Sequence, residues 1–444
     1  MFTINHKKLF LTLFLLVASV ATYANSTIAI QTWNTTRGTK VLFTEAHELP
    51  IFDINIIFYA GSVVDGKNHG LANFTSSMLD AGTKNLTVDQ IADSFDRLGA
   101  SFYAFASRDM NTAGLRCLTE PKILDTALQI FSTVLNEPSF PEREINRIRK
   151  QTLIAIEQKK QDPGSIAYDE FYKDLYKNFP YSHPTIGTAE TVSAINRKHI
   201  QDFYHKYYTT RNALIIMVGD VTRKQAEEIA EKLTAKLPLG EKAPTMQTLL
   251  QKPKSATKHL EFPSMQTNVF MGQLGITRNA PDYFPLYVGN YILGMSAISD
   301  LYLEIREKLG LVYGIYSYFS PALYQGPFII NFSSSNEKAD NALQIATKML
   351  NNFVEKGPTE EQLVAAKKSL TGKFPLRLAS NRAVAGALQE VGFYNLPLDY
   401  LDTYIDKINA VTLKDIQNAF KRHIDLGNML IVKVGKSSTS NPKS

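Results

Sequence analysis

The chain has 444 residues, which is too long for one ordinary hydrophobic core, so two or three domains are expected. Hydrophobic residues make up 44% and charged residues 20% of the sequence, as is typical of a soluble globular protein. The formal net charge of +6 is small and spread along the chain without a Lys/Arg block, so it does not favour a nucleic-acid-binding protein.

Residues 1–24 have the order of a secretory signal peptide. Two lysines precede an apolar run over residues 9–18, and small residues lead up to Ala24. The run is too short to span a bilayer comfortably, and no other segment is long and apolar enough to do so. We expect cleavage after Ala24, with Ala21 as the alternative, and therefore export across the inner membrane.

From Ser26 the first half alternates β-rich runs with amphipathic helical patterns. Thr87 to Gln90 fits a capping box, and Gly99 ends the helix that this box begins. The predicted strands cover residues 27–33, 40–43, 51–59, 101–106, 112–118 and 213–218. The predicted helices cover residues 69–80, 87–99, 122–135, 142–160, 165–176, 196–207 and 223–237.

Cys117 is the single cysteine, so an internal disulfide is excluded. It lies in one of these strand-like runs and is interpreted as a small buried hydrophobic residue rather than a catalytic thiol. An exported protein of this size can be stable on core burial alone.

Residues 239–258 contain prolines and polar residues with little apolar periodicity, which indicates a linker. The pattern then starts again. Predicted strands in the second half cover residues 259–262, 267–274, 312–319, 326–333 and 429–434. Predicted helices cover residues 285–293, 301–308, 338–356 and 359–370.

The two halves correspond to each other. Leu98–Ala106 matches Leu309–Ser317 at an offset of 211 residues (309 − 98), and at this offset Gly61 falls on Gly272. Each of these glycines is predicted to follow a strand and precede a helix. A duplicated α+β domain is the simplest interpretation, with domains at 25–238 and 259–438 and a tail at 439–444.

Residues 304–317 are predicted to form a helix end, a tight turn at Gly310 and a strand. Arg306 would lie at the end of the helix, and Tyr313 would lie on the strand, on the same face as Leu311 and Ile315. A fixed guanidinium beside a phenol suits a carbonyl that gains negative charge. Taken alone, however, these residues favour a surface arginine and a half-buried strand tyrosine.

Residues Gly70–Met78 read Gly-Leu-Ala-Asn-Phe-Thr-Ser-Ser-Met. This segment resembles the zinc-binding helix of the M16 metallopeptidases, the pitrilysin/insulinase family, in which it reads Gly-Leu-Ala-His-Phe-x-Glu-His-Met. Asn73 stands in place of the first His, Ser76 in place of the Glu and Ser77 in place of the second His. Two imidazoles are needed to bind Zn²⁺ and a carboxylate is needed to activate its water, so the resemblance implies a degenerate motif and no metal site in this chain.

The third zinc ligand of the family is a Glu on a later helix, and the matching window here is residues 148–157. Its likeliest position is Ile154, and the only acidic residue in the window is Glu157, which we interpret as part of a solvated helix face. No two histidines have the i, i+4 spacing. Ser76 and Ser77 are not expected to act as nucleophiles, because no Gly-x-Ser-x-Gly motif is present.

The second half keeps the family's other motif. Asn290–Gly294 followed by Leu303–Tyr313 resembles N-x-x-L-G…I-R-E-x-x-G-L-x-Y. In the family this Arg and Tyr reach across a chamber, hold the substrate and stabilise the oxyanion at the zinc site of the opposite half. The resemblance implies that Arg306 and Tyr313 have this role. It also implies an α+β fold of two homologous domains, each an antiparallel sheet layered with helices, that form half of a clamshell.

Some bacterial members of the family divide the zinc site and the Arg/Tyr pair between two chains. The resemblance therefore implies a non-catalytic, substrate-binding subunit of a heterodimeric zinc metalloendopeptidase, inactive alone and located in the periplasm. This chain would bind no cofactor; the zinc would lie in a partner carrying an intact His-x-x-Glu-His motif. The strand ending at Tyr59-Ala60-Gly61 is the predicted edge for pairing with an extended peptide. The alternatives are a proteolytically inactive peptide-binding or scaffold protein, a hydrolase with an unrecognised site, and a homodimer.

Overall fold

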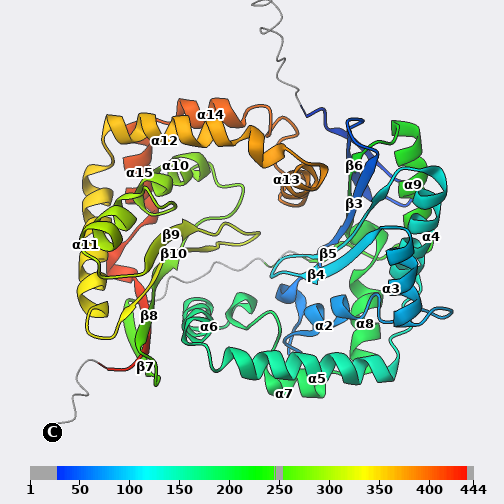
Figure 1. Ribbon diagram of the computed structural model, residues 1–444, viewed down its shortest axis with the longest axis horizontal. Helices are drawn as coiled ribbons and strands as arrows, with labels where there is room; N and C mark the ends of the chain where they lie inside the picture. Colours follow the sequence, from blue (N-terminus) through cyan, green and yellow to red (C-terminus); the bar gives the residue numbers. More distant parts are fainter. Residues whose placement is uncertain (1–27, 245, 247–253, 438–444) are drawn as a thin grey trace, which may run out of the picture.

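The computed structural model describes residues 28–244, 246 and 254–437. The predicted signal peptide, the tail at 439–444 and part of the linker lie outside these residues. Two β-sheets stand side by side, each with helices on its outer face (Figure 1). Among the described residues, no helix is both long enough and apolar enough to cross a membrane.

The two sheets have the same topology. The first has the order β1-β2-β6-β3-β5-β4 and the second the order β7-β11-β8-β10-β9, so β1 is the one addition. The first sheet comprises β1 (Gln31–Asn34), β2 (Lys40–Glu45), β3 (Ile51–Phe58), β4 (Ser101–Ala106), β5 (Asn111–Leu118) and β6 (Ala213–Gly219). The second comprises β7 (Ala256–Glu261), β8 (Gln266–Leu274), β9 (Gly314–Phe319), β10 (Pro327–Ser335) and β11 (Leu430–Gly435).

This arrangement confirms the predicted α+β fold of two related halves. The sheets are not purely antiparallel, however, because β2 pairs with β6, and β7 with β11, in parallel. The strand register also corrects one predicted correspondence. Asp53 of β3 pairs with Val218 of β6, and Asn268 of β8 pairs with Val434 of β11. Because Val218 and Val434 hold equivalent positions in their strands, Asp53 corresponds to Asn268. Gly272 therefore lies inside β8 and corresponds to Ile57 rather than to Gly61. The match between Gly99 and Gly310 holds, since both have φ of +60° after a helix.

The predicted peptide-binding edge is wrong. The strand before Tyr59-Ala60-Gly61 is β3, which lies in the middle of the sheet and pairs with β5 on one side and β6 on the other. The outermost strands near the middle of the molecule are β4 in the first sheet and β9 in the second. The periodicity of β3 could not reveal this, because a fully paired central strand and an edge strand can have the same apolar pattern.

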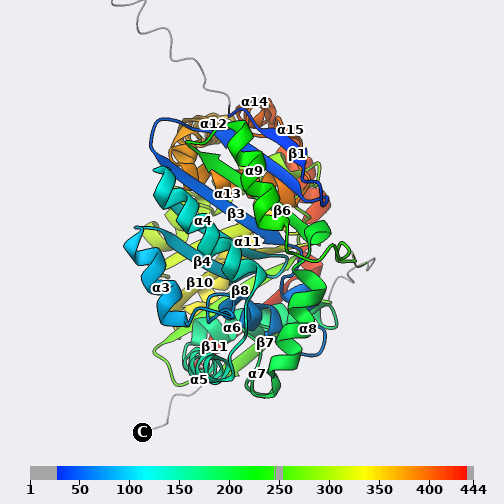
Figure 2. The same ribbon diagram turned by 90° about the vertical axis from the view of Figure 1, so that its right-hand side faces the viewer.

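Most helices of the first half cover the outer face of the first sheet or continue below it (Figures 1 and 2). The helices of this half are α2 (Leu71–Ser77), α3 (Val88–Arg97), α4 (Pro121–Asn136), α5 (Glu142–Lys159), α6 (Pro163–Tyr176), α7 (Ala189–Ala194), α8 (Arg197–Tyr207) and α9 (Arg223–Thr234). Those of the second half are α10 (Tyr283–Leu293), α11 (Ala339–Lys356), α12 (Glu360–Lys373), α13 (Asn381–Phe393), α14 (Tyr404–Ala410) and α15 (Leu413–His423). The last three lie in a region that the sequence patterns left unassigned.

The halves exchange one helix each. Helix α6 of the first half packs on β8 and β11, and α13 of the second half packs on β3 and β6. Both helices lie between the two sheets (Figure 1). Phe171 of α6 is fully buried against Phe270, and Leu388 of α13 is fully buried in the core cluster that contains Ile216. Separating the halves would therefore expose apolar surface on both sheets.

Cys117 of β5 is buried, as predicted, and burial raises the pKa of its thiol to about 12. A thiol held protonated in this way is a poor nucleophile at neutral pH. It belongs to the core on the outer face of the first sheet.

Candidate functional site

Helix α2 carries the three degenerate motif positions, and the carboxylate of Asp65 caps its first turn. The backbone N–H groups of Gly70 and Ala72 each donate to this carboxylate at 2.7 Å. Gly70 has φ of +93°, which favours glycine at the start of the helix. Burial raises the pKa of Asp65 to about 8, against the lowering effect of the two N–H groups. The helix packs against β4 and β5, beside the free edge of the first sheet.

The side chains at the motif positions do not fit a zinc ion. Ser76 is buried and its hydroxyl donates to Asn111 Oδ1 at 3.1 Å. Ser77 is exposed and its hydroxyl donates to the backbone carbonyl of Asn73 at 3.1 Å, a local bond within the helix. Across residues 28–244, 246 and 254–437, no group of three or more His, Cys, Asp or Glu side chains is arranged to hold a metal ion.

The window of the third ligand is also unsuited to metal binding. Ile154 of α5 is an aliphatic side chain with 50% exposure. Glu157 forms an exposed ion pair with Lys160 at 2.7 Å. This is the solvated helix face predicted from the sequence.

Two histidines stack near the start of α2. The rings of His69 and His183 are parallel, with centroids 4.0 Å apart. Burial lowers the pKa of His183 to about 4 and also lowers the pKa of His69. His183 Nε2 is buried without a hydrogen-bond partner among the described residues. Both rings are therefore neutral at pH 7, which allows them to stack.

His183 should make the protein less stable in mild acid. Because its folded pKa of about 4 lies below the ordinary value of 6.5, the unfolded chain binds a proton first as the pH falls. The free energy of unfolding is then expected to fall by about 2 kcal/mol between pH 7 and pH 5 on account of this group. Urea titrations at the two pH values should show a smaller fall in the free energy of unfolding for His183→Phe, in which the new ring can still stack on His69. The exposed His205→Gln serves as control, and an equal fall in all three proteins would contradict the assignment.

Arg306 lies on η4 (Tyr302–Lys308), which is a π-helix rather than the α-helix expected from the sequence. The backbone N–H of Leu309 donates to the carbonyl of Glu304 at 3.0 Å, the i, i+5 bond of a π-helix. Such turns are rare and are found frequently at functional sites. Arg306 is 41% exposed and forms a 2.6 Å ion pair with Glu307.

Tyr313 lies one residue before β9, not on the strand as predicted. A bend at this residue interrupts the alternation of faces, so Ile315 is buried whereas Tyr313 is 69% exposed. Arg306 Nε donates to the Tyr313 carbonyl at 3.4 Å, which holds the two residues together. Within the described part of the chain the Tyr313 hydroxyl has no hydrogen-bond partner. The Arg306 guanidinium and the Tyr313 phenol are thus both accessible to solvent.

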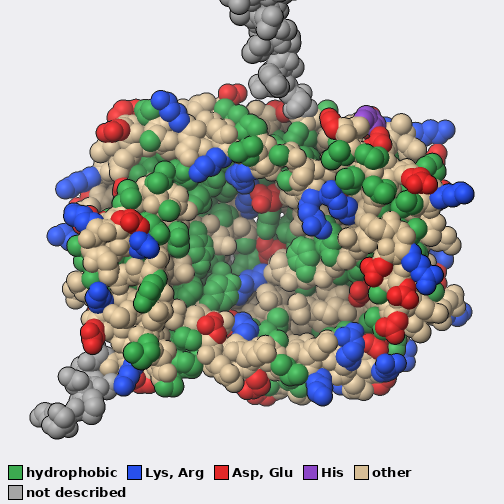
Figure 3. Space-filling model, viewed as in Figure 1, with side chains coloured by type: hydrophobic (Ala, Val, Ile, Leu, Met, Phe, Trp, Pro, Cys, Tyr) green, Lys and Arg blue, Asp and Glu red, His purple; other side chains and the backbone are tan. Residues whose placement is uncertain are grey.

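The structure does not bring this pair to the motif positions of α2. Figure 1 shows α2 and β9 on opposite sides of the space between the halves. Figure 3 shows a hollow there, with hydrophobic side chains along the wall of the second half and charged side chains within it. Among the described residues, no hydrogen bond or ion pair joins Arg306 or Tyr313 to the motif positions of α2.

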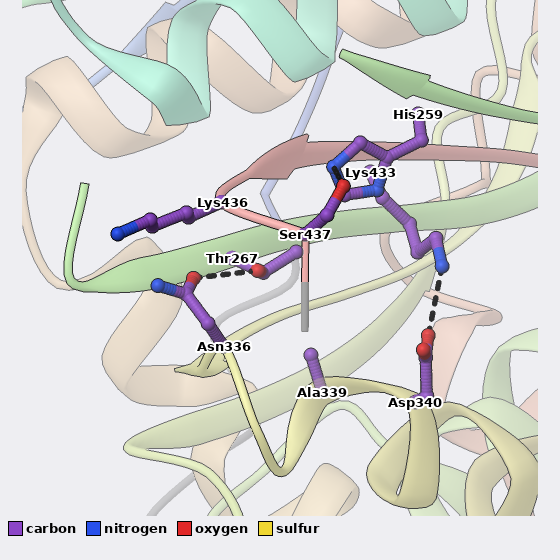
Figure 4. Close-up of a pocket in the computed structure, with 8 residues that line it drawn as sticks. All are labelled: His259, Thr267, Asn336, Ala339, Asp340, Lys433, Lys436 and Ser437. Carbon is purple, nitrogen blue, oxygen red and sulfur yellow. Dashed lines mark hydrogen bonds and ion pairs between the residues drawn. The ribbon is translucent and has the colours of Figure 1, made fainter. Parts of the chain in front are cut away.

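A separate polar pocket of about 250 Å³ lies at the end of the second sheet (Figure 4). Its polar groups are largely satisfied internally, since Lys433 pairs with Asp340 at 2.8 Å and Thr267 donates to Asn336 at 2.8 Å. None of its lining residues belongs to the predicted site. The lining consists of His259, Thr267, Asn336, Ala339, Asp340, Lys433, Lys436 and Ser437.

Known proteins share this sequence pattern and fold. The profile of the insulinase family (peptidase family M16) matches residues 40–189, and that of the peptidase M16 inactive domain matches residues 194–370. A crystal structure of a peptidase M16 inactive domain from Pseudomonas fluorescens is 38% identical, covers 93% of this chain and 99% of that chain, and superposes with a TM-score of 0.90.

Two curated relatives carry differing names. A Rickettsia bellii protein named an uncharacterized zinc protease is 30% identical over 290 residues, 65% of this chain and 69% of the relative. A Helicobacter pylori protein named a non-peptidase homologue is 26% identical over 395 residues, 88% of this chain and 90% of the relative.

Proposed function

Because this chain belongs to the insulinase family of M16 peptidases, we propose that it is the non-catalytic, substrate-binding subunit of a heterodimeric zinc metalloendopeptidase. One observation carries the proposal: the Arg306 and Tyr313 side chains are both accessible to solvent and their residues are joined by a hydrogen bond, whereas the motif positions on α2 offer no zinc ligand. The zinc would lie in a partner subunit with an intact His-x-x-Glu-His motif.

Arg306 and Tyr313 would act on a peptide carbonyl held at the partner's zinc. That metal, when bound, would supply the activated water for hydrolysis. In this chain, the Tyr313 carbonyl and Glu307 fix the Arg306 guanidinium, which leaves N–H groups free to face the carbonyl oxygen as it gains negative charge. The Tyr313 hydroxyl would donate a second hydrogen bond. Donors held in place before the reaction cost little reorganisation when the charge develops.

The free edge of β4 is the proposed site for the peptide backbone. Its outer N–H and C=O groups have no partner strand in the sheet order, so an extended peptide can pair there by β-augmentation. Helix α2 packs against β4, which would place such a peptide beside the motif helix.

We also propose that the chain works in the periplasm after removal of a signal peptide, with cleavage after Ala24 or Ala21. The basis is the order of charged, apolar and small residues at the N-terminus.

A proteolytically inactive peptide-binding or scaffold protein is the second candidate function. The name of the Helicobacter pylori relative, a non-peptidase homologue, favours it. The exposed Arg306–Tyr313 pair favours the first candidate, because binding alone does not require donors for a developing negative charge.

Reconstitution of the complex with a zinc-binding subunit distinguishes the two candidate functions. The mature chain alone should not hydrolyse an unfolded peptide, whereas a mixture with a His-x-x-Glu-His subunit encoded in the same genome should do so and should lose activity with a chelator. The partner alone and the partner with heat-denatured chain are the controls. Chelator-sensitive hydrolysis by the single chain, or a partner equally active without it, would refute the proposal.

A further inference from the structure

The inner face of the first sheet beside the β4 edge carries side chains that the zinc-motif comparison does not use. On β4, Phe102 packs against the core on the outer side of the sheet, so Ser101, Tyr103 and Phe105 face the space between the halves. Ser101 pairs with Arg116 of β5, Tyr103 with Gly114 and Phe105 with Thr112. The exposed Phe105 and the half-buried Tyr103 form a stacked aromatic pair, with ring centroids 6.4 Å apart.

Tyr103 is held flat against the sheet. Its ring crosses the position opposite it, Gly114, and its hydroxyl donates to Asn55 Oδ1 of β3 at 2.5 Å. A Cβ atom at Gly114 would lie 2.2 Å from Tyr103 Cζ, so the ring can take this position only because residue 114 has no side chain. The aromatic face is therefore a fixed platform next to the free edge.

One arginine above this platform forms no ion pair in the described chain, although its charge, together with that of Arg116, opposes the rise that burial causes in the pKa of Asp53. Arg116 is committed to Asp53, with Nη1 at 3.0 Å from Oδ2. Arg382, contributed by α13 of the second half, is exposed and lies with its guanidinium carbon 5.3 Å from the centre of the Tyr103 ring. Throughout the described residues it forms no ion pair and its side chain makes no hydrogen bond. The group thus has two guanidinium cations and one carboxylate, which leaves a net positive charge.

The position of Arg382 relative to the edge strand decides what this charge can meet. A peptide paired with β4 would lie about 4.8 Å beyond it, with every second side chain on the inner face. An inward side chain opposite Tyr103 would then lie beside Tyr103 on the side away from Gly114, with the Tyr103 ring and the Arg382 guanidinium as its nearest inner-face neighbours. A solvated arginine on a helix is common, but here the guanidinium stands over the Tyr103 ring, whose strand is the one at which backbone pairing is available.

We propose that Arg382 binds a carboxylate of the peptide on the β4 edge, so that this chain selects extended peptides with an acidic side chain at the position opposite Tyr103. The inference rests on the proposed function for the presence of a peptide at this edge. It adds the chemical class of the preferred peptide, and it makes the second half responsible for selection at an edge of the first half.

Binding to the mature chain alone tests this without a partner subunit. Fluorescence anisotropy would compare two labelled, end-blocked ten-residue peptides rich in Val and Thr that differ only in a central Glu or Gln. The Glu peptide should bind about tenfold more tightly, and high salt should reduce the difference. The Gln peptide with a free C-terminal carboxylate forms a third arm, which shows whether a chain terminus can replace the side chain.

Arg382→Gln should abolish the preference, and Arg382→Glu should reverse it toward a peptide with a central Lys. Arg97→Gln is the matched control, because Arg97 is an exposed arginine on the outer helix α3. A preference that survives in Arg382→Gln, or equal binding of the Glu and Gln peptides to the unmodified chain, overturns this inference and leaves the proposed function standing. If no peptide binds, both this inference and peptide binding at β4 fail, whereas the reconstituted activity tests the role of Arg306 separately.

Discussion

Arg306→Ala is expected to lower kcat of the reconstituted peptidase by about two orders of magnitude, the usual cost of losing one donor to a developing oxyanion. The guanidinium is exposed and held by the Tyr313 carbonyl and Glu307, so its removal should not disturb the core. Tyr313→Phe removes only the hydroxyl, which has no partner in the described chain, and should lower kcat without changing stability. Initial rates on an unfolded peptide, with the partner subunit in excess, measure both effects.

Lys308→Ala is the matched control for Arg306→Ala. Lys308 lies on the same helix, is exposed and pairs with Glu304 at 3.0 Å, so its loss also changes the local charge. Its kcat should stay close to that of the unmodified chain. If Arg306→Ala and Tyr313→Phe leave kcat unchanged while the mixture remains active, the pair has no part in hydrolysis and the chain serves only to bind or to assemble.

Asp109→Ala is expected to reduce the free energy of unfolding by about 3 kcal/mol, because it leaves one buried and two half-buried donors without their acceptor. Asp109 lies in the turn between β4 and β5 and is buried, which raises the pKa of its carboxyl. It accepts hydrogen bonds from the Tyr181 hydroxyl, from the Tyr394 hydroxyl at 3.2 Å and from the Leu323 backbone N–H at 2.8 Å. The first donor belongs to the first half and the other two to the second.

Urea unfolding of the mature chain at pH 7 measures the effect. Asp125→Ala is the matched control, since Asp125 is exposed on α4 and its loss should change stability by no more than about 0.5 kcal/mol. Asp109→Asn keeps one acceptor oxygen, so its free energy of unfolding should lie between those of Asp109→Ala and Asp125→Ala. Equal midpoints for Asp109→Ala and Asp125→Ala would show that this network does not hold the halves together.

The Asp109 network and the exchange of α6 and α13 have the same consequence. Each half completes the inner side of the other half's sheet, so the described residues form one interlocked unit. The placement of Arg382 follows from this interlocking, because α13, which begins after residue 380, brings Arg382 over the Tyr103 ring of β4. A peptide at the proposed β4 site would therefore meet side chains of both halves.

Local residue patterns were sufficient for most of the elements and for the composition of the site. The capping box at Thr87 and the Gly99 and Gly310 turns depend on neighbours in sequence, and the structure shows all three. The replacement of zinc ligands at Asn73, Ser76 and Ser77 could likewise be predicted from the sequence. So could the Arg306–Tyr313 motif, although its placement on a π-helix and before a bend could not.

Only the tertiary structure showed which segments pack against each of these elements. The central place of β3, the free edge of β4 and the position of Arg382 over Tyr103 all depend on contacts between residues far apart in the sequence. Apolar periodicity shows which face of a strand or helix is buried, but it does not identify the segment that packs against that face. The sequence alone therefore determined that the zinc-motif positions hold Asn73, Ser76 and Ser77 and that Arg306 and Tyr313 follow the family pattern. Only the packing of distant segments decided which strand lies at the edge of the sheet and that Arg382 stands over the Tyr103 ring.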